Sequence, residues 1–474
     1  MNAREVAYTA LLASLRQEAF ISHTLEKWMK AEHPSSQDFA FAYEIAAGSA
    51  RMALTLDYLA TQLSSTKKLN LKTKERALLR TAVYQHYFMD KVPLYAIVNE
   101  SIEIAKKYCH QTFISFLNAL LRKLAETQAI LPSGNSPTEL SIRYSYPEYF
   151  IDTLIDDYGT TIAENLLATG NTPPKTMARV RPGVDISKEA FQFLHLQEAS
   201  IPVAIIDKAA SLAALAELPE IYIQNATPVA LVASLAERTQ TPKRILDLCA
   251  SPGGKLLAAH DLYPHAKLFA NDVSQEKLLR LSHNLRKYGV QADLTCGPGE
   301  AYGLNLETTV QDAKVMQDSE LEHLTAVGDH SQKVKAPPVV SGSDSKNCIN
   351  LPSSTAVSRL KEPFDLIILD VPCSNSGVLN KRPEARWRLT SQTLEKLAQT
   401  QKRLIHHATT LLAPSGVIWY LTCSILKEEN EKLIDLACRH TGLYAEYTHT
   451  ILPNGDGWDG GFAALLKNRV RYDS

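Results

Sequence analysis

RILDLCASPGGKLLAAHDLYPHAKLFAND, residues 244–272, predicts a strand, a glycine turn, a helix and a second strand. The first apolar run ends at Leu248, and the turn before the helical stretch covers residues 249–255. The second apolar run ends in Asn271 and Asp272. Glycines let a ligand approach the backbone, and the N–H groups of a helix N-terminus face it. The stretch therefore predicts the first half of a nucleotide-binding βαβ unit.

The composition of the turn favours a ligand without phosphate groups. The turn consists of Cys249, Ala250, Ser251, Pro252, Gly253, Gly254 and Lys255. It is not a GxGxxG loop, and it lacks the GK[ST] ending of a phosphate-binding loop. S-adenosylmethionine suits such a turn, and Asp272, 17 residues after Lys255, can bind two ribose hydroxyls. The alternative is a tight strand-to-helix turn that needs glycine only for its backbone.

Length and composition describe a multidomain protein of a reducing compartment. The 474 residues exceed the size of one hydrophobic core. A net charge of −1 confines any RNA-binding face to a local patch. Seven scattered cysteines disfavour a disulfide framework, and no run approaches the ~20 apolar residues of a membrane span. The N-terminus does not look like a signal peptide. We expect a cytoplasmic protein that is monomeric and holds no metal.

Three regions follow one another along the chain. Residues 1–130 show helical apolar spacing, which predicts an all-α domain. Residues 142–222, after a linker rich in Pro, Ser, Gly and Asn, are predicted to be a small α/β subdomain. Residues 223–474 alternate strand and helix patterns, which predicts a mostly parallel sheet with helices on both faces. The Ser-rich residues 303–360 interrupt this alternation and are interpreted as a flexible insertion.

Two groups of residues are candidates for an RNA surface. One is a run of basic residues in the helical region, with an arginine upstream: Arg51, Lys67, Lys68, Lys72, Lys74, Arg76 and Arg80. The other places aromatic residues 144–147 and basic residues 179–181 in one region. For both groups the alternative is an ordinary solvated or packed set of side chains.

Cys373 and Cys423 each follow the end of an apolar strand pattern. The carboxyl ends of parallel strands meet at the sheet edge where ligands bind, which is also the edge of the glycine turn. A structural cysteine is instead expected inside a strand or helix, packed as a small hydrophobe. A helix is predicted to begin near Lys427, and its N–H groups are expected to favour the thiolate of Cys423.

A cysteine beside a methyl donor indicates one reaction in particular. Carbon 5 of a pyrimidine is a poor nucleophile until a thiolate adds at carbon 6. An acid near ring nitrogen 3 stabilises the charge that builds on the ring, and Asp370 stands three residues before Cys373. The base must leave its stack to enter such a pocket. These residues alone leave open which cysteine attacks.

Three motifs resemble the signature set of RNA cytosine-5 methyltransferases: LDLCASPGGK (246–255), LDVPCSNSG (369–377) and YLTCSILKEENE (420–431). The helical region resembles the NusB family of RNA-binding domains through six short pieces: ARE (3–5), ERALLR (75–80), VP (92–93), VNE (98–100), IAKKY (104–108) and FLNALLR (116–122). Apart from the insertion, the chain resembles the RsmB (Sun, Fmu) type of bacterial 16S rRNA methyltransferase. That resemblance implies a NusB-like domain followed by a Rossmann-like methyltransferase domain.

The resemblance also implies residue roles. Cys423 is the nucleophile that attacks carbon 6, and Cys373 helps release the product. Residues 249–255, Asp272 and Asp370 form the S-adenosylmethionine site, with Asp370 facing the base as well. Arg386, in PEARWRL, is a candidate for holding RNA phosphate.

The chain departs from the family pattern at three places. Pro298 falls at or near the position of an acid expected after the third strand. The family's QDAS reads QNAT (224–227), and its DGFF reads DGGF (459–462). These changes bear on cofactor affinity. Because both cysteines, Asp370 and the glycine turn are present, we expect catalysis to remain.

The sequence predicts an S-adenosylmethionine-dependent methyltransferase that modifies carbon 5 of a cytosine in 16S rRNA, free or in an assembling small subunit. One alternative is a catalytically weakened RNA-binding ribosome-assembly factor, which the missing acid and the insertion favour. Another is the same chemistry on tRNA or DNA; the helical domain disfavours DNA but does not exclude tRNA.

Overall fold

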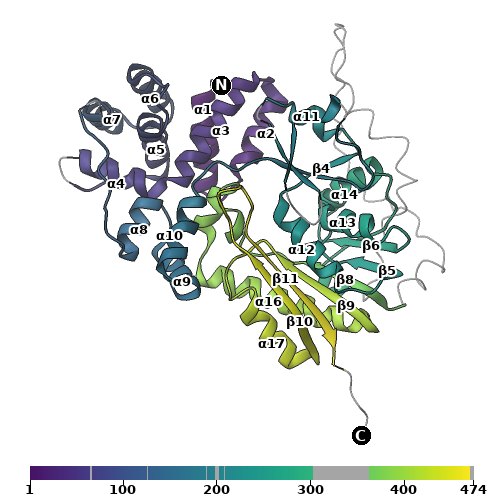
Figure 1. Cartoon of the computed structure of the whole chain (residues 1–474). Helices are drawn as coiled ribbons and strands as arrows, with labels where there is room; N and C mark the ends of the chain where they lie inside the picture. Colours follow the sequence, from purple (N-terminus) through teal and green to yellow (C-terminus); the bar gives the residue numbers. More distant parts are fainter. Residues whose placement is uncertain are drawn as a thin grey trace, which may run out of the picture.

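The computed structural model describes residues 1–64, 67–124, 126–187, 189–197, 202–207, 209–302 and 362–469. A helical N-terminal part lies beside an α/β part with a large twisted sheet (Figure 1). The predicted insertion, residues 303–360, lies outside the described residues. None of the described helices is long and apolar enough to cross a membrane.

The N-terminal part is all-helical, as the apolar spacing predicts. Its helices are α1 (Ala3–Leu15), α2 (Ile21–Glu32), α3 (Ser36–Arg51), α4 (Ala53–Leu63), α5 (Thr73–Phe88), α6 (Leu94–Tyr108) and α7 (Gln111–Leu124). The N-cap Asn2 accepts a hydrogen bond from the N–H of Glu5, which starts α1. Helix α1 then packs against α2, α3 and α5, and its fully buried Tyr8 and Leu11 belong to one core.

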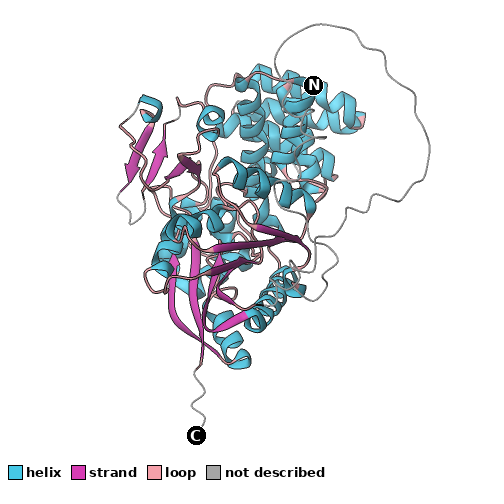
Figure 2. Ribbon diagram, turned by 90° about the vertical axis from the view of Figure 1, so that its right-hand side faces the viewer, coloured by secondary structure: helices cyan, strands magenta, loops and turns pink. Residues whose placement is uncertain are grey.

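The predicted small subdomain consists of two different pieces. Helices α8 (Pro137–Tyr144), α9 (Glu148–Tyr158) and α10 (Thr160–Thr169) come first. An antiparallel sheet in the order β2-β3-β1-β4 follows, formed by β1 (Met177–Val180), β2 (Leu194–Gln197), β3 (Val203–Ile206) and β4 (Ile221–Ile223), with α11 (Leu212–Ala216) before the last strand. Figure 2 shows this small sheet apart from the main one. The α8–α10 helices share a core with Leu379 and Ile425 of the α/β part.

The main sheet is seven-stranded in the described residues, in the order β10-β11-β9-β8-β5-β6-β7. Its strands are β5 (Arg244–Asp247), β6 (Lys267–Asp272), β7 (Asp293–Cys296), β8 (Phe364–Asp370), β9 (Leu412–Thr422), β10 (Leu443–Ile451) and β11 (Gly461–Asn468). Strands β9, β8, β5, β6 and β7 are parallel, and β10–β11 is an antiparallel edge hairpin. The predicted mostly parallel sheet is therefore confirmed.

Helices cover both faces of this sheet, so a central strand such as β8 is apolar and buried at most positions. One face carries α12 (Ala226–Ala236), α13 (Gly254–Leu262) and α14 (Gln275–Lys287), and the other carries α16 (Ser391–Leu411) and α17 (Glu431–Thr441). Side chains of a strand alternate between the two cores: Leu366 and Ile368 join the first, whereas Ile367 and Leu369 join the second. This packing brings the carboxyl ends of β5, β6, β8 and β9 to one edge.

Arg386 joins the two parts and does not serve as a phosphate ligand, contrary to prediction. It has no exposed surface and lies in the short helix η4 (Pro383–Arg388). Its Nη1 donates to the carbonyl oxygens of Arg51 (3.0 Å) and Ser145 (3.1 Å). Neighbouring Trp387 donates to the carbonyl oxygen of Ala50 (2.7 Å). Burial lowers the pKa of Arg386 to about 10. The guanidinium that was expected to bind RNA phosphate donates its hydrogen bonds to backbone carbonyl oxygens instead.

Candidate active site

The two strand-end cysteines meet at the edge of the main sheet. Strands β8 and β9 pair in parallel, with Asp370 opposite Leu421, so the turns after them lie side by side. The sulfur atoms of Cys373 and Cys423 are 3.1 Å apart. The structure thus brings together two thiols that are fifty residues apart in sequence. Two thiols at this distance can share a proton or act in succession on one substrate atom.

A buried carboxylate ties the two cysteine turns together. Glu429 has no exposed surface, and it accepts hydrogen bonds from the N–H of Ser374 (2.9 Å) and from the hydroxyl of Ser424 (2.7 Å). Ser374 follows one cysteine and Ser424 follows the other. Gln401 of α16 donates to the same carboxylate (3.1 Å). These hydrogen bonds tie the two turns to each other and to α16, which holds the thiols in register.

The side chain of Asn375 bridges the same two turns from the other side. Its Nδ2 donates to the carbonyl oxygen of Cys373 (3.1 Å), and its Oδ1 accepts from the sulfur of Cys423 (3.3 Å). Asn375 has φ +60°, in the left-handed region that asparagine tolerates better than most residues. The sequence interpretation assigned no role to Glu429 or Asn375.

The electrostatic surroundings distinguish the two thiols. The hydrogen bond to Cys423, burial and the charge of Glu429 raise the pKa of Cys373 well above its ordinary value. Cys373 therefore loses its proton less readily than an ordinary cysteine, and in the contact between the two sulfurs either atom can be the donor. The predicted contact of Cys423 with a helix N-terminus is absent among the described residues, because α17 begins only at Glu431.

The glycine turn forms the start of α13, as the spacing predicts. Gly253 is the N-cap of this helix with φ +106°, a conformation that L side chains rarely adopt. A Cβ on Gly254 would lie 2.8 Å from Nε2 of Gln224 and 3.2 Å from the ring of Tyr222. The backbone conformation thus requires glycine at position 253, whereas at position 254 neighbouring side chains limit the space. A turn that needs glycine for structural reasons can also bind a ligand, so this observation does not decide between the two interpretations.

Charged groups gather between the turn and the thiols. Nζ of Lys255 lies 2.6 Å from Oδ2 of Asp370. Burial opposes the charge of Lys255, but the charge of Asp370 and the hydrogen bond to it outweigh burial and raise the lysine pKa overall. Asp247, at the end of β5, is buried and close to Asp370, and burial followed by this repulsion raises its pKa to about 8. A cation such as a sulfonium would find compensating carboxylates here.

Asp272 lies at the end of β6, beside the glycine turn. Its carboxylate accepts from the N–H of Ser251 (3.1 Å) and of Val273 (2.7 Å), and Lys277 lies 3.3 Å away. Next to it, a Cβ on Gly297 would meet no atom within 4 Å, so open space adjoins the strand ends. The residues present therefore fit a nucleoside whose ribose hydroxyls reach Asp272.

The expected third-strand acid is missing in the structure as well. Pro298 follows β7 and precedes the short helix η2 (Gly299–Ala301). The nearest carboxylate along the chain, Glu300, lies 3.7 Å from Nε of Arg403 on α16. We find no acid at the end of β7 in the described residues.

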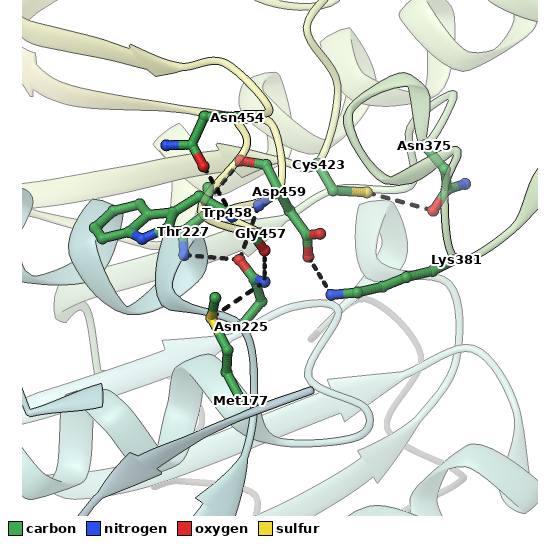
Figure 3. Close-up of polar contacts among 10 residues, drawn as sticks. All are labelled: Met177, Asn225, Thr227, Asn375, Lys381, Cys423, Asn454, Gly457, Trp458 and Asp459. Carbon is green, nitrogen blue, oxygen red and sulfur yellow. Dashed lines mark hydrogen bonds and ion pairs between the residues drawn. The ribbon is translucent and has the colours of Figure 1, made fainter. Parts of the chain in front are cut away.

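The other two departures from the family pattern contact each other (Figure 3). Oδ1 of Asn225 accepts from the N–H of Thr227 (3.1 Å), which caps α12, and from the N–H of Asp459 (2.9 Å). Thr227 donates to the carbonyl oxygen of Asp459 (2.6 Å), and Lys381 pairs with the Asp459 carboxylate (2.6 Å). Asn225 and Asp459 therefore hold the loop before β11 against α12.

In both groups of residues that are candidates for an RNA surface, several side chains bind other parts of the protein. Arg76 (2.7 Å) and Arg80 (2.8 Å) bind the carboxylate of Asp57. Arg51 is buried and donates to the carbonyl oxygen of Asn380 (3.3 Å). In the second group Arg179 and Arg181 both bind Asp261, and Tyr146 is buried. The structure supports the packing interpretation for these residues, which leaves the lysines of the first group as candidates.

Comparisons with known proteins cover nearly the whole chain. Residues 1–126 match the NusB family, and residues 234–312 and 292–467 match the family of 16S rRNA methyltransferase RsmB/F. Ribosomal RNA small subunit methyltransferase B of Proteus mirabilis is 25% identical over 99% of both chains. The protein of the same name from Shewanella oneidensis is 26% identical over 92% of this chain and 89% of that one. The crystal structure of PH0851 has the same fold, with a TM-score of 0.69 at 20% identity over 99% of both chains.

The fold and these matches define a methyltransferase with an α/β catalytic domain and a NusB-like helical domain. The particular family follows from the two family models, which match residues 1–126 and residues 234–467. The chain belongs to the RsmB/F family of methyltransferases.

Proposed function

We propose that this protein methylates carbon 5 of a cytosine in 16S rRNA, with S-adenosylmethionine as methyl donor. The observation that carries this proposal is the 3.1 Å contact between the Cys373 and Cys423 sulfurs beside the Lys255–Asp370 pair. Methyl transfer to oxygen or to an amino group needs no thiol, whereas carbon 5 of a pyrimidine needs covalent activation. The names of the relatives support rRNA as the substrate. Such an enzyme acts in the cytoplasm, where ribosomes assemble.

Each of the residues at this site has a separate role in the reaction. The Cys423 thiolate adds to carbon 6, and the ring electrons move toward carbon 5, which can then accept a methyl group. S-adenosylmethionine supplies that methyl group when bound by residues 249–255 and Asp272. Asp370, with Lys255 behind it, faces ring nitrogen 3 and stabilises charge on the ring. Solvent water takes the proton from carbon 5, and the sulfur–carbon bond then breaks with its electron pair returning to the Cys423 sulfur. The Cys373 thiol then donates a hydrogen bond to the departing Cys423 sulfur.

The competing proposal is an RNA-binding assembly factor with weakened catalysis. Pro298, in place of an acid after β7, is the observation that favours it. Binding alone requires neither thiol, so the close pair of cysteines favours the enzyme. The same chemistry on tRNA is a further alternative. A comparison of methylation rates on rRNA and on tRNA distinguishes it from the proposed function.

The deciding experiment uses radiolabelled S-adenosylmethionine with unmodified 16S rRNA, small-subunit particles and tRNA as substrates. Wild type is compared with Cys423→Ala and Cys373→Ala, and covalent RNA–protein adducts are resolved on a denaturing gel. Cys109→Ala, in the helical domain, is the matched control. We expect label with wild type and the control, none with Cys423→Ala, and an accumulated adduct with Cys373→Ala. RNA binding without label in any substrate would establish the assembly factor instead.

A further inference from the structure

The side-chain amide of Asn375 can take only one orientation between the two cysteine turns. The carbonyl oxygen of Cys373 is solely an acceptor, so the amide nitrogen of Asn375 must face it (3.1 Å). This places Oδ1 against the sulfur of Cys423 (3.3 Å), as Figure 3 shows. An amide oxygen is also solely an acceptor. The contact with Cys423 therefore forms only when that sulfur carries its proton.

A directional chain of hydrogen bonds follows from this orientation. Because the single proton of Cys423 is directed at Asn375, the proton in the 3.1 Å contact between the two sulfurs must come from Cys373. Cys423 in turn donates to Oδ1 of Asn375. The backbone of Cys373 closes the ring by accepting from Asn375. Each donor has one acceptor, and the arrangement is complete only with both thiols protonated.

Some charged groups around the thiols favour the thiolate form, and others favour the protonated thiol. Lys255 interacts with Cys423 and favours the thiolate, but its ammonium is paired with Asp370 and lies near Asp247. From the segment before α17, the charge of Glu429 acts on the neighbouring thiol, Cys373. On the far side, Lys381 is neutralised by Asp459. Two uncharged groups contact the sulfur of Cys423 directly, the Cys373 thiol and the side-chain amide of Asn375.

We propose that Asn375 is a positioning residue that holds the sulfur of Cys423 as a neutral thiol in the resting protein. This inference rests on the proposed function, in which Cys423 is the nucleophile. When an incoming base displaces the amide oxygen, the thiol loses this stabilisation, and Cys423 releases its proton to solvent water to form the thiolate. The resting enzyme keeps its nucleophile unreactive toward other electrophiles until RNA occupies the site.

The test measures the rate at which iodoacetamide alkylates Cys423 in the full-length protein, as a function of pH. Peptide mass spectrometry separates Cys423 from the other six cysteines. Asn375→Gly keeps the left-handed backbone and removes the acceptor, so the midpoint of the profile should fall by about 0.5–1 pH unit. That shift corresponds to roughly a three- to tenfold faster reaction below the midpoint. Asn375→Asp adds a negative acceptor and should move the midpoint upward.

The control is His33→Gly, which changes an exposed left-handed residue of the helical domain in the same way. It should leave the Cys423 profile unchanged. Equal midpoints for wild type, Asn375→Gly and Asn375→Asp would overturn the proposal, as would shifts of both variants in one direction. The measurement needs neither cofactor nor RNA. If the alkylation midpoints of the variants shift as expected but RNA is not methylated, the result therefore counts against the proposed function alone.

Discussion

At the scale of single residues, a few buried side chains do more for the site than its exposed charges. Glu429 illustrates this, because its carboxylate accepts from the backbone of one cysteine turn and from the hydroxyl of the other. A buried acceptor of this kind stabilises the fold mainly because its removal leaves a buried donor, such as the N–H of Ser374, unsatisfied. Its neighbour Glu428 is half-exposed and pairs with Lys432 (2.8 Å) on the surface.

We therefore expect Glu429→Ala to lower the free energy of unfolding by about 3 kcal/mol, since buried donors are left unsatisfied. Glu428→Ala should cost less than about 1 kcal/mol, because a solvated ion pair contributes little. Urea denaturation followed by circular dichroism measures both. Equal effects at the two positions would show that the Glu429 network does not stabilise the cysteine turns.

At the scale of elements, the glycine turn and α13 show how a local motif depends on a distant contact. The turn begins after β5, but the space at Gly254 is limited by Gln224 and Tyr222, which lie about thirty residues upstream in and after β4. Spacing along the chain predicts the turn. It does not reveal which neighbour makes a second glycine necessary.

Gly254→Ala should destabilise the protein by about 1–3 kcal/mol, because its Cβ would lie 2.8 Å from Gln224. Adding Gln224→Ala should restore part of that loss. Gly455→Ala, where a Cβ meets no atom within 4 Å, is the control and should change little. Thermal unfolding measures stability, and calorimetry with S-adenosylmethionine measures binding, which we expect to weaken roughly tenfold or more in Gly254→Ala. No rescue by Gln224→Ala would rule out this contact as the cause.

At the scale of the whole molecule, the helical and α/β parts form one unit through buried polar contacts. Arg386 donates to carbonyl oxygens on both sides of the junction, and Asn171 and Tyr146 also accept from it. The junction fixes where the NusB-like domain lies relative to the cysteines. An RNA that contacts both parts would therefore be read by a rigid surface.

Arg386→Ala should remove about 4 kcal/mol of stability and separate unfolding into two transitions, because the carbonyl groups of the junction lose their donor. Arg382→Ala, four residues earlier and exposed, should stay within about 0.5 kcal/mol of wild type. Differential scanning calorimetry of the full chain records both. A single unshifted transition for Arg386→Ala would show that other contacts couple the two parts.

The sequence by itself determined the helical N-terminal domain, the parallel sheet and the positions of residues 249–255, Cys373 and Cys423 at strand ends. These features depend on the periodicity of apolar residues and on turn residues, which are local properties of the chain. Only the tertiary structure decided the partners of charged and polar side chains. It paired Arg76 and Arg80 with Asp57, buried Arg386 in the domain junction, and brought Asn375 and Glu429 to the two thiols. Such pairings depend on distances between segments far apart in sequence, and these distances exist only after the elements pack together.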